Sequence, residues 1–374
     1  MRLARLLLLH RLLVLLGCCL VLPLSAAPSV VFINPGNADE PYWRDATDAM
    51  QLAADSLGMQ LEVLYAERDY LAQISLTRDV TERSSDQRPD YMLIAADKRT
   101  LPEQLGLIEA AGIKTVSAWN AVQADERPVV GYPREHFSHW LGSVVPRAED
   151  AGVLTAQALM SEAKRRGWLS DDQVFEVVAI SGDRSSDSSI RRNQGMLDAF
   201  AAHPHVKLHQ LVHGDWQRDK AAEQAKHLYR RYPGIRAIWT GNDLMAFGAM
   251  QALAEQGLEP GKDILYSTVN ASEQGMQEII DGQLTALAGG HHMAGAWGLV
   301  MLYDYHHGVD FASNEGTELV QPMFTLFTPA LAQRFLALQA ADAPPVDFCA
   351  FSKACNPART DYDFTIGAWL EPTP

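Results

Sequence analysis

Residues 28–58 read PSVVFINPGNADEPYWRDATDAMQLAADSLG and predict one strand followed by one helix. Val30 to Ile33 form a continuous apolar run, which is typical of a strand covered on both faces. Apolar residues then recur at helical spacing, at Trp43, Ala46, Ala49, Met50, Ala53 and Leu57. We expect the helix to end at Gly58, because glycine suits a left-handed C-cap. Strand, loop and helix in this order are the unit of a parallel α/β sheet.

The same alternation continues along the chain in two series. Further strand candidates of the first series lie at 61–64, 91–94 and 113–118, with helix candidates near 70–85 and 101–111. The second series begins with a helix near 136–167 and contains strand candidates at 174–180, 206–212, 235–239 and 264–269, with helices near 188–202, 243–256 and 272–280. We therefore expect an α/β fold of two doubly wound parallel-sheet lobes. In such sheets, ligands bind outside the carboxyl ends of the strands.

Length and composition agree with two lobes and exclude one class of partner. The chain has 374 residues, 47% of them hydrophobic, whereas a single core rarely grows beyond about 250–300 residues. The formal net charge is −15, with no run of like charges. An acidic chain offers little to a polyanionic phosphate backbone, so nucleic acid is not an expected partner.

Residues 1–27 have the pattern of a secretory signal peptide. Three arginines accompany an apolar run, Leu12 to Leu22, which is shorter than the ~20 residues of a membrane-spanning helix. The small residues Ser25 and Ala27 suit signal peptidase, so we expect export to the periplasm and cleavage after Ala27. An alternative remains, because Leu15–Cys18 resembles a lipoprotein cleavage box in which Cys18 would carry the lipid. We favour the unlipidated form.

Cys349 and Cys355 are the only cysteines after the signal peptide, since Cys18 and Cys19 leave with it. In an oxidising compartment we expect them to form a disulfide that pins a C-terminal tail, residues 341–374. A structural zinc site is not expected, because no neighbouring Cys or His completes a set of four ligands.

Patterns for catalysis, metals and nucleotide cofactors are missing from the sequence. It contains no G-x-S-x-G, and no strand–helix junction carries G-x-G-x-x-G. His205, His209 and His213 fall four residues apart, but their segment favours a strand, on which they lie too far apart to share one ion. For these, and for the pair His291–His292, a structural role is favoured over a metal site. We expect no cofactor, no metal and no enzymatic activity.

Three tryptophans occupy predicted strand-to-helix loops. Trp43 follows the first strand, Trp119 follows the strand candidate at 113–118, and Trp216 follows the one at 206–212. Loops after parallel strands converge at the ligand-binding edge. Sugar rings offer C–H faces that stack on indole and hydroxyls that need paired donors and acceptors. These loops therefore predict a cleft for a small sugar-like ligand, although each Trp taken alone fits a core position equally well.

Several of these loops, taken in order, match a known pattern. The segments are Glu40–Trp43, Gly131–Tyr132, Arg192–Met196, Asp215–Trp216, Gly241–Ala249 and Val269–Ala271. With them the chain resembles type 1 periplasmic binding proteins of the ribose-binding kind, from Pro28 to about Thr328. The resemblance implies two lobes that close on a ligand about a three-segment hinge.

The resemblance also implies roles for individual residues. Tyr42 and Trp43 would sandwich the ligand from the first lobe, Trp216 would close on it from the second, and Asn242 would meet ring hydroxyls. Departures occur at Trp119–Asn120, where the family usually has Asp-Arg, and at Gly289, where a polar residue is usual; Arg191 is the arginine nearest the usual ligand-binding position. The complete set of expected ligand-binding residues is Tyr42, Trp43, Asp97, Trp119, Asn120, Arg191, Trp216, Asn242, Asp243 and Asn270.

The resemblance implies a lobe organisation and two alternative partners. The N-terminal lobe is expected at 28–132 and 290–321 and the C-terminal lobe at 133–289 and 322–340, with crossings near Gly131–Arg134, Gly289 and Gln321–Pro322. A monomer that delivers its ligand to the permease of an ABC importer is favoured. Asp90, Tyr91 and Asp97, the run Tyr42–Arg44 and the long C-terminal tail are similar to the autoinducer-2-binding branch, which implies the alternative of a receptor for a membrane sensor kinase. A repressor of this fold would need a DNA-binding helix-turn-helix where the signal peptide stands.

Overall fold

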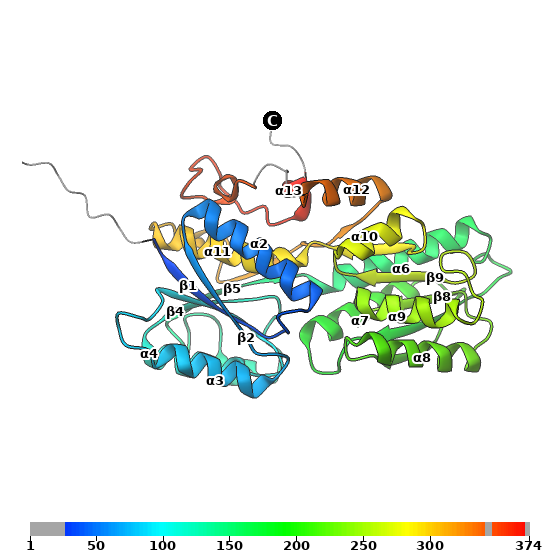
Figure 1. Ribbon diagram of the computed structural model, residues 1–374, viewed down its shortest axis with the longest axis horizontal. Coiled ribbons are helices and arrows are strands. Elements are labelled where there is room, and N and C mark those ends of the chain that lie inside the picture. The colour runs from blue at the N-terminus through cyan, green and yellow to red at the C-terminus, as the bar shows by residue number, and fades with distance from the viewer. Residues whose placement is uncertain (1–26, 341–345, 371–374) are drawn as a thin grey trace, which may run out of the picture.

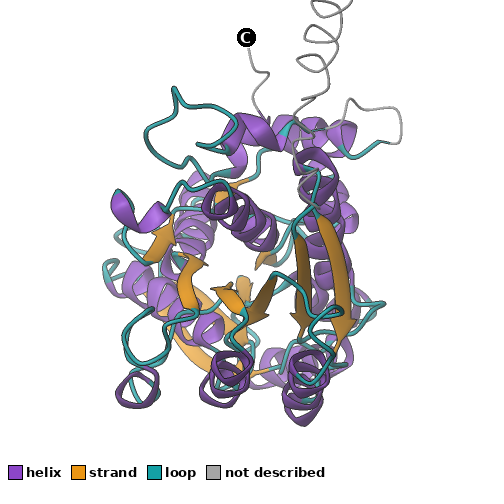
Figure 2. Ribbon diagram, turned by 90° about the vertical axis from the view of Figure 1, so that its left-hand side faces the viewer, coloured by secondary structure: helices purple, strands orange, loops and turns teal. Residues whose placement is uncertain are grey.

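The computed structural model describes residues 27–340 and 346–370, which form two α/β lobes arranged along the long axis of the molecule (Figure 1). In each lobe helices cover both faces of a six-stranded sheet (Figure 2). The expected fold class is confirmed. Residues 1–26 of the predicted signal peptide lie outside the described residues, as do 341–345 and 371–374.

The first lobe contains a parallel sheet whose strand order is β11-β5-β4-β3-β1-β2. Its strands are β1 (Ser29–Asn34), β2 (Gln60–Tyr65), β3 (Tyr91–Ala95), β4 (Lys114–Ala118), β5 (Trp140–Pro146) and β11 (Glu318–Gln321). Helices α2 (Pro41–Leu57) and α11 (Ala294–His306) pack on one face, whereas α3 (Tyr70–Thr81) and α4 (Leu101–Ala111) pack on the other. Short segments α5 (Arg127–Val130) and η2 (Phe311–Ser313) complete this lobe.

The second lobe repeats this architecture with the strand order β12-β10-β9-β8-β6-β7, in which only β12 runs antiparallel to its neighbour. Its strands are β6 (Phe175–Ser181), β7 (Val206–His213), β8 (Ala237–Thr240), β9 (Leu265–Val269), β10 (Ala286–Gly289) and β12 (Thr325–Leu326). Helices α6 (Ala148–Arg165) and α7 (Asp187–Ala201) cover one face. The other face carries α8 (Arg218–Arg231), α9 (Asp243–Ala254), α10 (Glu273–Ile280) and α12 (Pro329–Leu338). Among the described residues, no helix combines the length and apolarity that crossing a bilayer requires.

The predicted boundary between the lobes is wrong at its first crossing. The segment near 136–167 is not one helix, because β5 pairs with β4 and β11 in the first sheet before α6 begins in the second lobe. The chain therefore crosses between Pro146 and Ala148 and not near Gly131–Arg134. Every residue of β5 is buried, and α6, which follows almost directly, is rich in small apolar residues. The helical spacing of α6 therefore made the whole segment resemble one helix.

The two later crossings join β10 to α11 and β11 to β12. The first of these passes through η1 (His291–Met293), a short 3-10 helix. Together with the crossing after β5, they give three chain segments between the lobes.

The C-terminal tail contains η3 (Phe348–Phe351), the disulfide Cys349–Cys355 and α13 (Ile366–Leu370). The Cα atoms of the two bonded cysteines are 5.2 Å apart. The predicted disulfide is confirmed.

Candidate functional site

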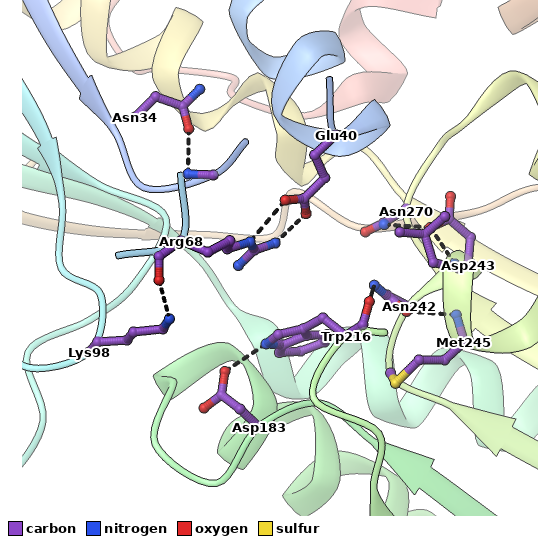
Figure 3. Close-up of polar contacts among 12 residues, drawn as sticks. Asn34, Glu40, Arg68, Lys98, Asp183, Trp216, Asn242, Asp243, Met245 and Asn270 are labelled. Carbon is purple, nitrogen blue, oxygen red and sulfur yellow. Dashed lines mark hydrogen bonds and ion pairs between the residues drawn. The ribbon is translucent and has the colours of Figure 1, made fainter. Parts of the chain in front are cut away.

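A pocket of about 70 Å³ lies between the two lobes, beyond the carboxyl ends of the strands. The part of it around Glu40, Arg68, Trp216 and Asn242 is drawn in Figure 3. The complete lining is Glu40, Tyr42, Trp43, Arg68, Asp97, Trp119, Asn120, Pro146, Ser186, Ser188, Arg192, Trp216, Asn242, Asn270 and His291. Eight of the ten expected residues belong to this lining, and the exceptions are Arg191 and Asp243.

The first lobe presents a cluster of aromatic rings to the pocket. Trp43 lies in the first turn of α2 and meets Trp119 edge to face, with ring centroids 5.2 Å apart. Tyr42 packs against Trp43 at 5.1 Å. Trp119 directly follows β4 with φ of 69°, a left-handed conformation, and its ring stacks on Phe32 at 5.0 Å. The sharp turn after β4 therefore directs this indole into the cluster.

The second lobe presents Trp216, whose indole is held from two sides. Its Nε1 donates to Asp183 Oδ2 at 2.6 Å (Figure 3), and its ring lies so close to Gly182 that a Cβ there would be 2.1 Å from the indole. Asp183 also accepts from the backbone N–H groups of Ser185 and Ser186, each at 2.7 Å. Burial raises the pKa of Asp183, but these donated bonds outweigh burial and leave the pKa below its usual value. Asp183 is therefore an ionised anchor for Trp216.

Two amides come from the loops before α9 and after β9. Asn242 is the N-cap of α9, and its Oδ1 accepts from Met245 N at 3.0 Å. Asn270 Nδ2 donates to Asp243 Oδ1 at 2.8 Å (Figure 3). Asp243 is 3% exposed and lies behind the pocket wall, so its expected contact with a ligand is not what the structure shows. Asp243 orients the side chain of Asn270, because a buried amide group needs a hydrogen-bond acceptor and Asp243 Oδ1 supplies one.

The expected arginine, Arg191, faces away from the pocket. It pairs with Asp187 and Glu149 at 2.7 and 2.6 Å, and 42% of its side chain is exposed. The next residue, Arg192, lines the pocket and is 5% exposed. Consecutive helical residues point about 100° apart, so only one of the two can face the other lobe.

Arg192 joins α7 to the hinge. Its Nη1 donates to Gly241 O and its Nη2 bonds to His291 Nε2, both at 2.8 Å. Burial lowers the pKa of Arg192 to about 10. Burial and the charge of Arg192 hold the pKa of His291 well below its usual value. His291 is therefore a neutral imidazole that accepts at Nε2, which assigns its proton to Nδ1.

Sequence reasoning missed the pocket roles of His291 and Arg192 and a half-buried ion pair, Glu40–Arg68. Arg68 Nε donates to Glu40 Oε2 at 2.8 Å, and Nη2 contacts the other carboxylate oxygen (Figure 3). The expected residue Asp97 lies beside this pair, and burial raises the pKa of its carboxyl group. The only sequence signal for Glu40 was its place beside the aromatic pair at 42 and 43.

Some polar atoms at this interface have no hydrogen-bond partner within the described residues. They include the indole Nε1 of Trp43, Nε of Arg192 and Oγ of Ser186, all buried. Buried polar groups in native proteins are almost always paired. Trp43, Arg192 and Ser186 are therefore lining residues that each carry one polar atom unpaired within the described part of the chain.

Comparison with known proteins agrees with this geometry. Residues 30–308 match the family model described as periplasmic binding protein domain. The chain belongs to the periplasmic binding protein family. The D-allose-binding periplasmic protein of Escherichia coli (strain K12) is 26% identical over 270 residues, which are 71% of this chain and 80% of that protein. The ribose import binding protein RbsB of Haemophilus influenzae is 24% identical over 277 residues, or 74% and 85% of the two chains.

A solved structure extends the similarity to most of the chain. A periplasmic sugar-binding protein from Pseudomonas fluorescens is 35% identical, with a TM-score of 0.82, and the match covers 92% of this chain and 99% of that one. A solute-binding protein from Actinobacillus succinogenes with bound D-allose has a TM-score of 0.69 at 16% identity, which shows the shared fold. This member of the family is a binding protein and not an enzyme.

The two lobes of this binding protein also contact each other directly beside the pocket. Asn120 Oδ1 accepts from Ser188 N at 3.3 Å and from the Ser188 hydroxyl. Ala121 N donates to Asp187 Oδ2 at 3.1 Å. Because these bonds run from the loop after β4 to the start of α7, the structure is a closed form of the binding protein.

We expect Arg192→Gln to lower the free energy of unfolding by about 1.5–3 kcal/mol, because it leaves buried acceptors on Gly241 and His291 without a charged donor. The neighbouring variant Arg191→Gln is the matched control and should cost at most about 1 kcal/mol, since its ion pairs are partly exposed. Urea unfolding of both variants measures the difference. Equal losses would show that the Arg192 contacts contribute nothing specific.

The stability of this binding protein should depend on Asp45 between pH 4 and 7. Asp45 lies in α2 of the first lobe. Burial raises the pKa of its carboxyl group to about 7, and the negative charges of Asp243 and Glu273 in the second lobe contribute in the same direction. The folded state then binds a proton that the unfolded state has released, so the stability contributed by Asp45 is lost as pH rises through 7. We expect Asp45→Asn to become progressively more stable than the parent from pH 4 to pH 7, with a constant difference above.

Thermal unfolding across this pH range measures the effect. Asp79→Asn, on the exposed side of α3, controls for removing one negative charge. A stability difference between Asp45→Asn and the parent that does not change with pH would contradict the assignment.

Proposed function

We propose that this protein captures a monosaccharide or a sugar-like molecule in the periplasm by hinge closure and delivers it to an ABC importer. The observation that carries the proposal is the two-sided pocket, in which Trp43 and Trp119 come from one lobe and Trp216 and Arg192 from the other. A ligand that touches both walls binds the closed state better than the open one and shifts the population towards closure. A permease then recognises the closed shape of the binding protein, which acts as a monomer.

The chemistry of the lining supports a neutral polyhydroxylated ligand. Indole rings offer apolar faces for the C–H side of a sugar ring, while Asn242, Asn270 and Arg192 offer donors for its hydroxyls. The allose- and ribose-binding relatives support a single small sugar ring as the ligand.

The alternative is a receptor that presents an autoinducer-2-like molecule to a membrane sensor kinase. Asp90 and Tyr91, two of the residues that suggested it, lie outside the pocket lining. Asp90 accepts from Ser29 N and Oγ, both at 2.8 Å, and Tyr91 bonds to His306 at 3.1 Å. Tyr42, Trp43 and Asp97 line the pocket and fit either role. We favour the importer role because the curated relatives include allose- and ribose-binding periplasmic proteins.

A ligand screen tests the proposed function. Purified mature protein is titrated with pentoses, hexoses, furanose sugars, inositols and autoinducer-2, and the thermal midpoint is recorded, because a ligand of the folded state raises it. We expect one sugar to raise the midpoint, and Trp216→Ala to weaken its binding by about 2 kcal/mol or more, roughly thirtyfold in Kd. Trp168→Ala, a tryptophan outside the pocket lining, is the matched control. Equal binding by the parent and Trp216→Ala would refute the stacking model.

We also infer export by residues 1–27 with cleavage after Ala27. Intact mass measurement of periplasmic protein should then give a chain that begins at Pro28 with no lipid attached. A diacylated product that begins at Cys18, abolished by Cys18→Ser, would establish the lipoprotein alternative instead.

A further inference from the structure

From α12 onward, the chain passes from the second lobe to the first and back. Helix α12 packs in the core of the second lobe, residues 346–364 pack on the first lobe, and α13 returns to the second (Figure 1). The family match ends at residue 308, so this course lies outside the matched domain.

A buried carboxylate anchors the tail to the first lobe. Asp304, in α11, is fully buried and accepts from the backbone N–H groups of Lys353 and Ala354 at 2.9 and 3.0 Å. It also accepts from the hydroxyls of Ser352 and Tyr362. Breaking these four hydrogen bonds would leave buried polar groups without partners, so this anchor ties the tail firmly to α11.

Aromatic packing and the disulfide strengthen the same anchor. Phe364 stacks on Trp297 of α11 with ring centroids 5.0 Å apart and planes within 9°. Phe348 N donates to Ser56 Oγ of α2 at 2.8 Å. The disulfide Cys349–Cys355 closes the short loop that follows Phe348. Residues 346–364 therefore move with the first lobe.

Two residues of α13 anchor the tail to the second lobe. Ile366 and Leu370 are 1% and 2% exposed and belong to the core that contains Phe327 and Phe335. Only Thr365 separates Ile366 from the ring stack on the first lobe. A change in the angle between the lobes must therefore be taken up over very few residues, or the contacts of α13 must break.

The second anchor also touches the hinge itself. Gly290 has φ of 117°, and a Cβ at this position would be 3.0 Å from Ile366. Gly290 directly precedes His291, which bonds to Arg192 in the pocket wall. Ile366 thus supports the chain crossing that carries a pocket residue.

We propose that residues 346–370 form a brace that joins the two lobes beside the hinge, limits how far they open, and positions the crossing that carries His291. The brace acts on the protein without ligand, so its test is independent of the ligand proposed above.

The opening is measured by pulsed electron spin resonance on the full mature chain. Nitroxides are placed at Ser75→Cys in α3 and Glu223→Cys in α8, which are exposed positions. Helices α3 and α8 lie on the side of the molecule opposite α12 and α13 (Figure 1). The native cysteines are held in the disulfide and do not react. We expect Ile366→Ser to shift the ligand-free distance distribution to longer and broader values than the parent gives.

Two controls separate the brace from a general loss of stability. Ile190→Ser changes an isoleucine that is 46% exposed on α7 and should leave the distribution unchanged. The conservative variant Ile366→Val should retain the parent distribution.

A chain that ends at Thr365 is a second test of the brace. It removes α13 while keeping the first anchor, and should widen the distribution even if Ile366→Ser fails to fold. Parent-like distributions in the folded variants that lack the Ile366 contact would overturn the proposal.

Discussion

The guanidinium of Arg192 is the contact that ties the wall of the pocket to the hinge. It extends from α7 in the second lobe to Gly241 at the start of α9 and to His291 at the hinge crossing. A buried cation is costly unless its N–H groups are paired, and here a carbonyl and a neutral imidazole accept two of its bonds. The position of the hinge crossing is thereby tied to the wall of the pocket.

Three aspartates, of which Asp243 and Asp304 are buried and Asp183 is half-buried, shape the molecule through the residues they hold. Asp183 fixes the indole of Trp216, Asp243 fixes the amide of Asn270, and Asp304 fixes the tail on α11. Each lobe therefore presents side chains that are already oriented within that lobe. Such preorganisation lowers the ordering cost of binding, because closure brings together two prepared surfaces and does not have to build them.

Much of the fold followed from local patterns. The apolar run at 30–33 and the helical spacing up to Gly58 correspond to β1 and α2, with Gly58 in the left-handed conformation as expected. The same reasoning failed at β5, where a fully buried strand borders a helix rich in small apolar residues. Periodicity cannot separate a short buried strand from an adjoining buried helix, and only its pairing with β4 and β11 shows which sheet it joins.

The sequence by itself determined the two-lobed α/β architecture, the loops that carry Trp43, Trp119 and Trp216, and the pairing of the two tail cysteines, because these depend on local periodicity and on residue counts. Tertiary structure alone decided that Arg192 and not Arg191 enters the pocket, that Asp243 lies behind Asn270, and that His291 joins the lining. It also decided the course of the tail across both lobes. The physical reason is that the direction of a side chain, and the partner that pairs with it when buried, depend on elements distant in sequence.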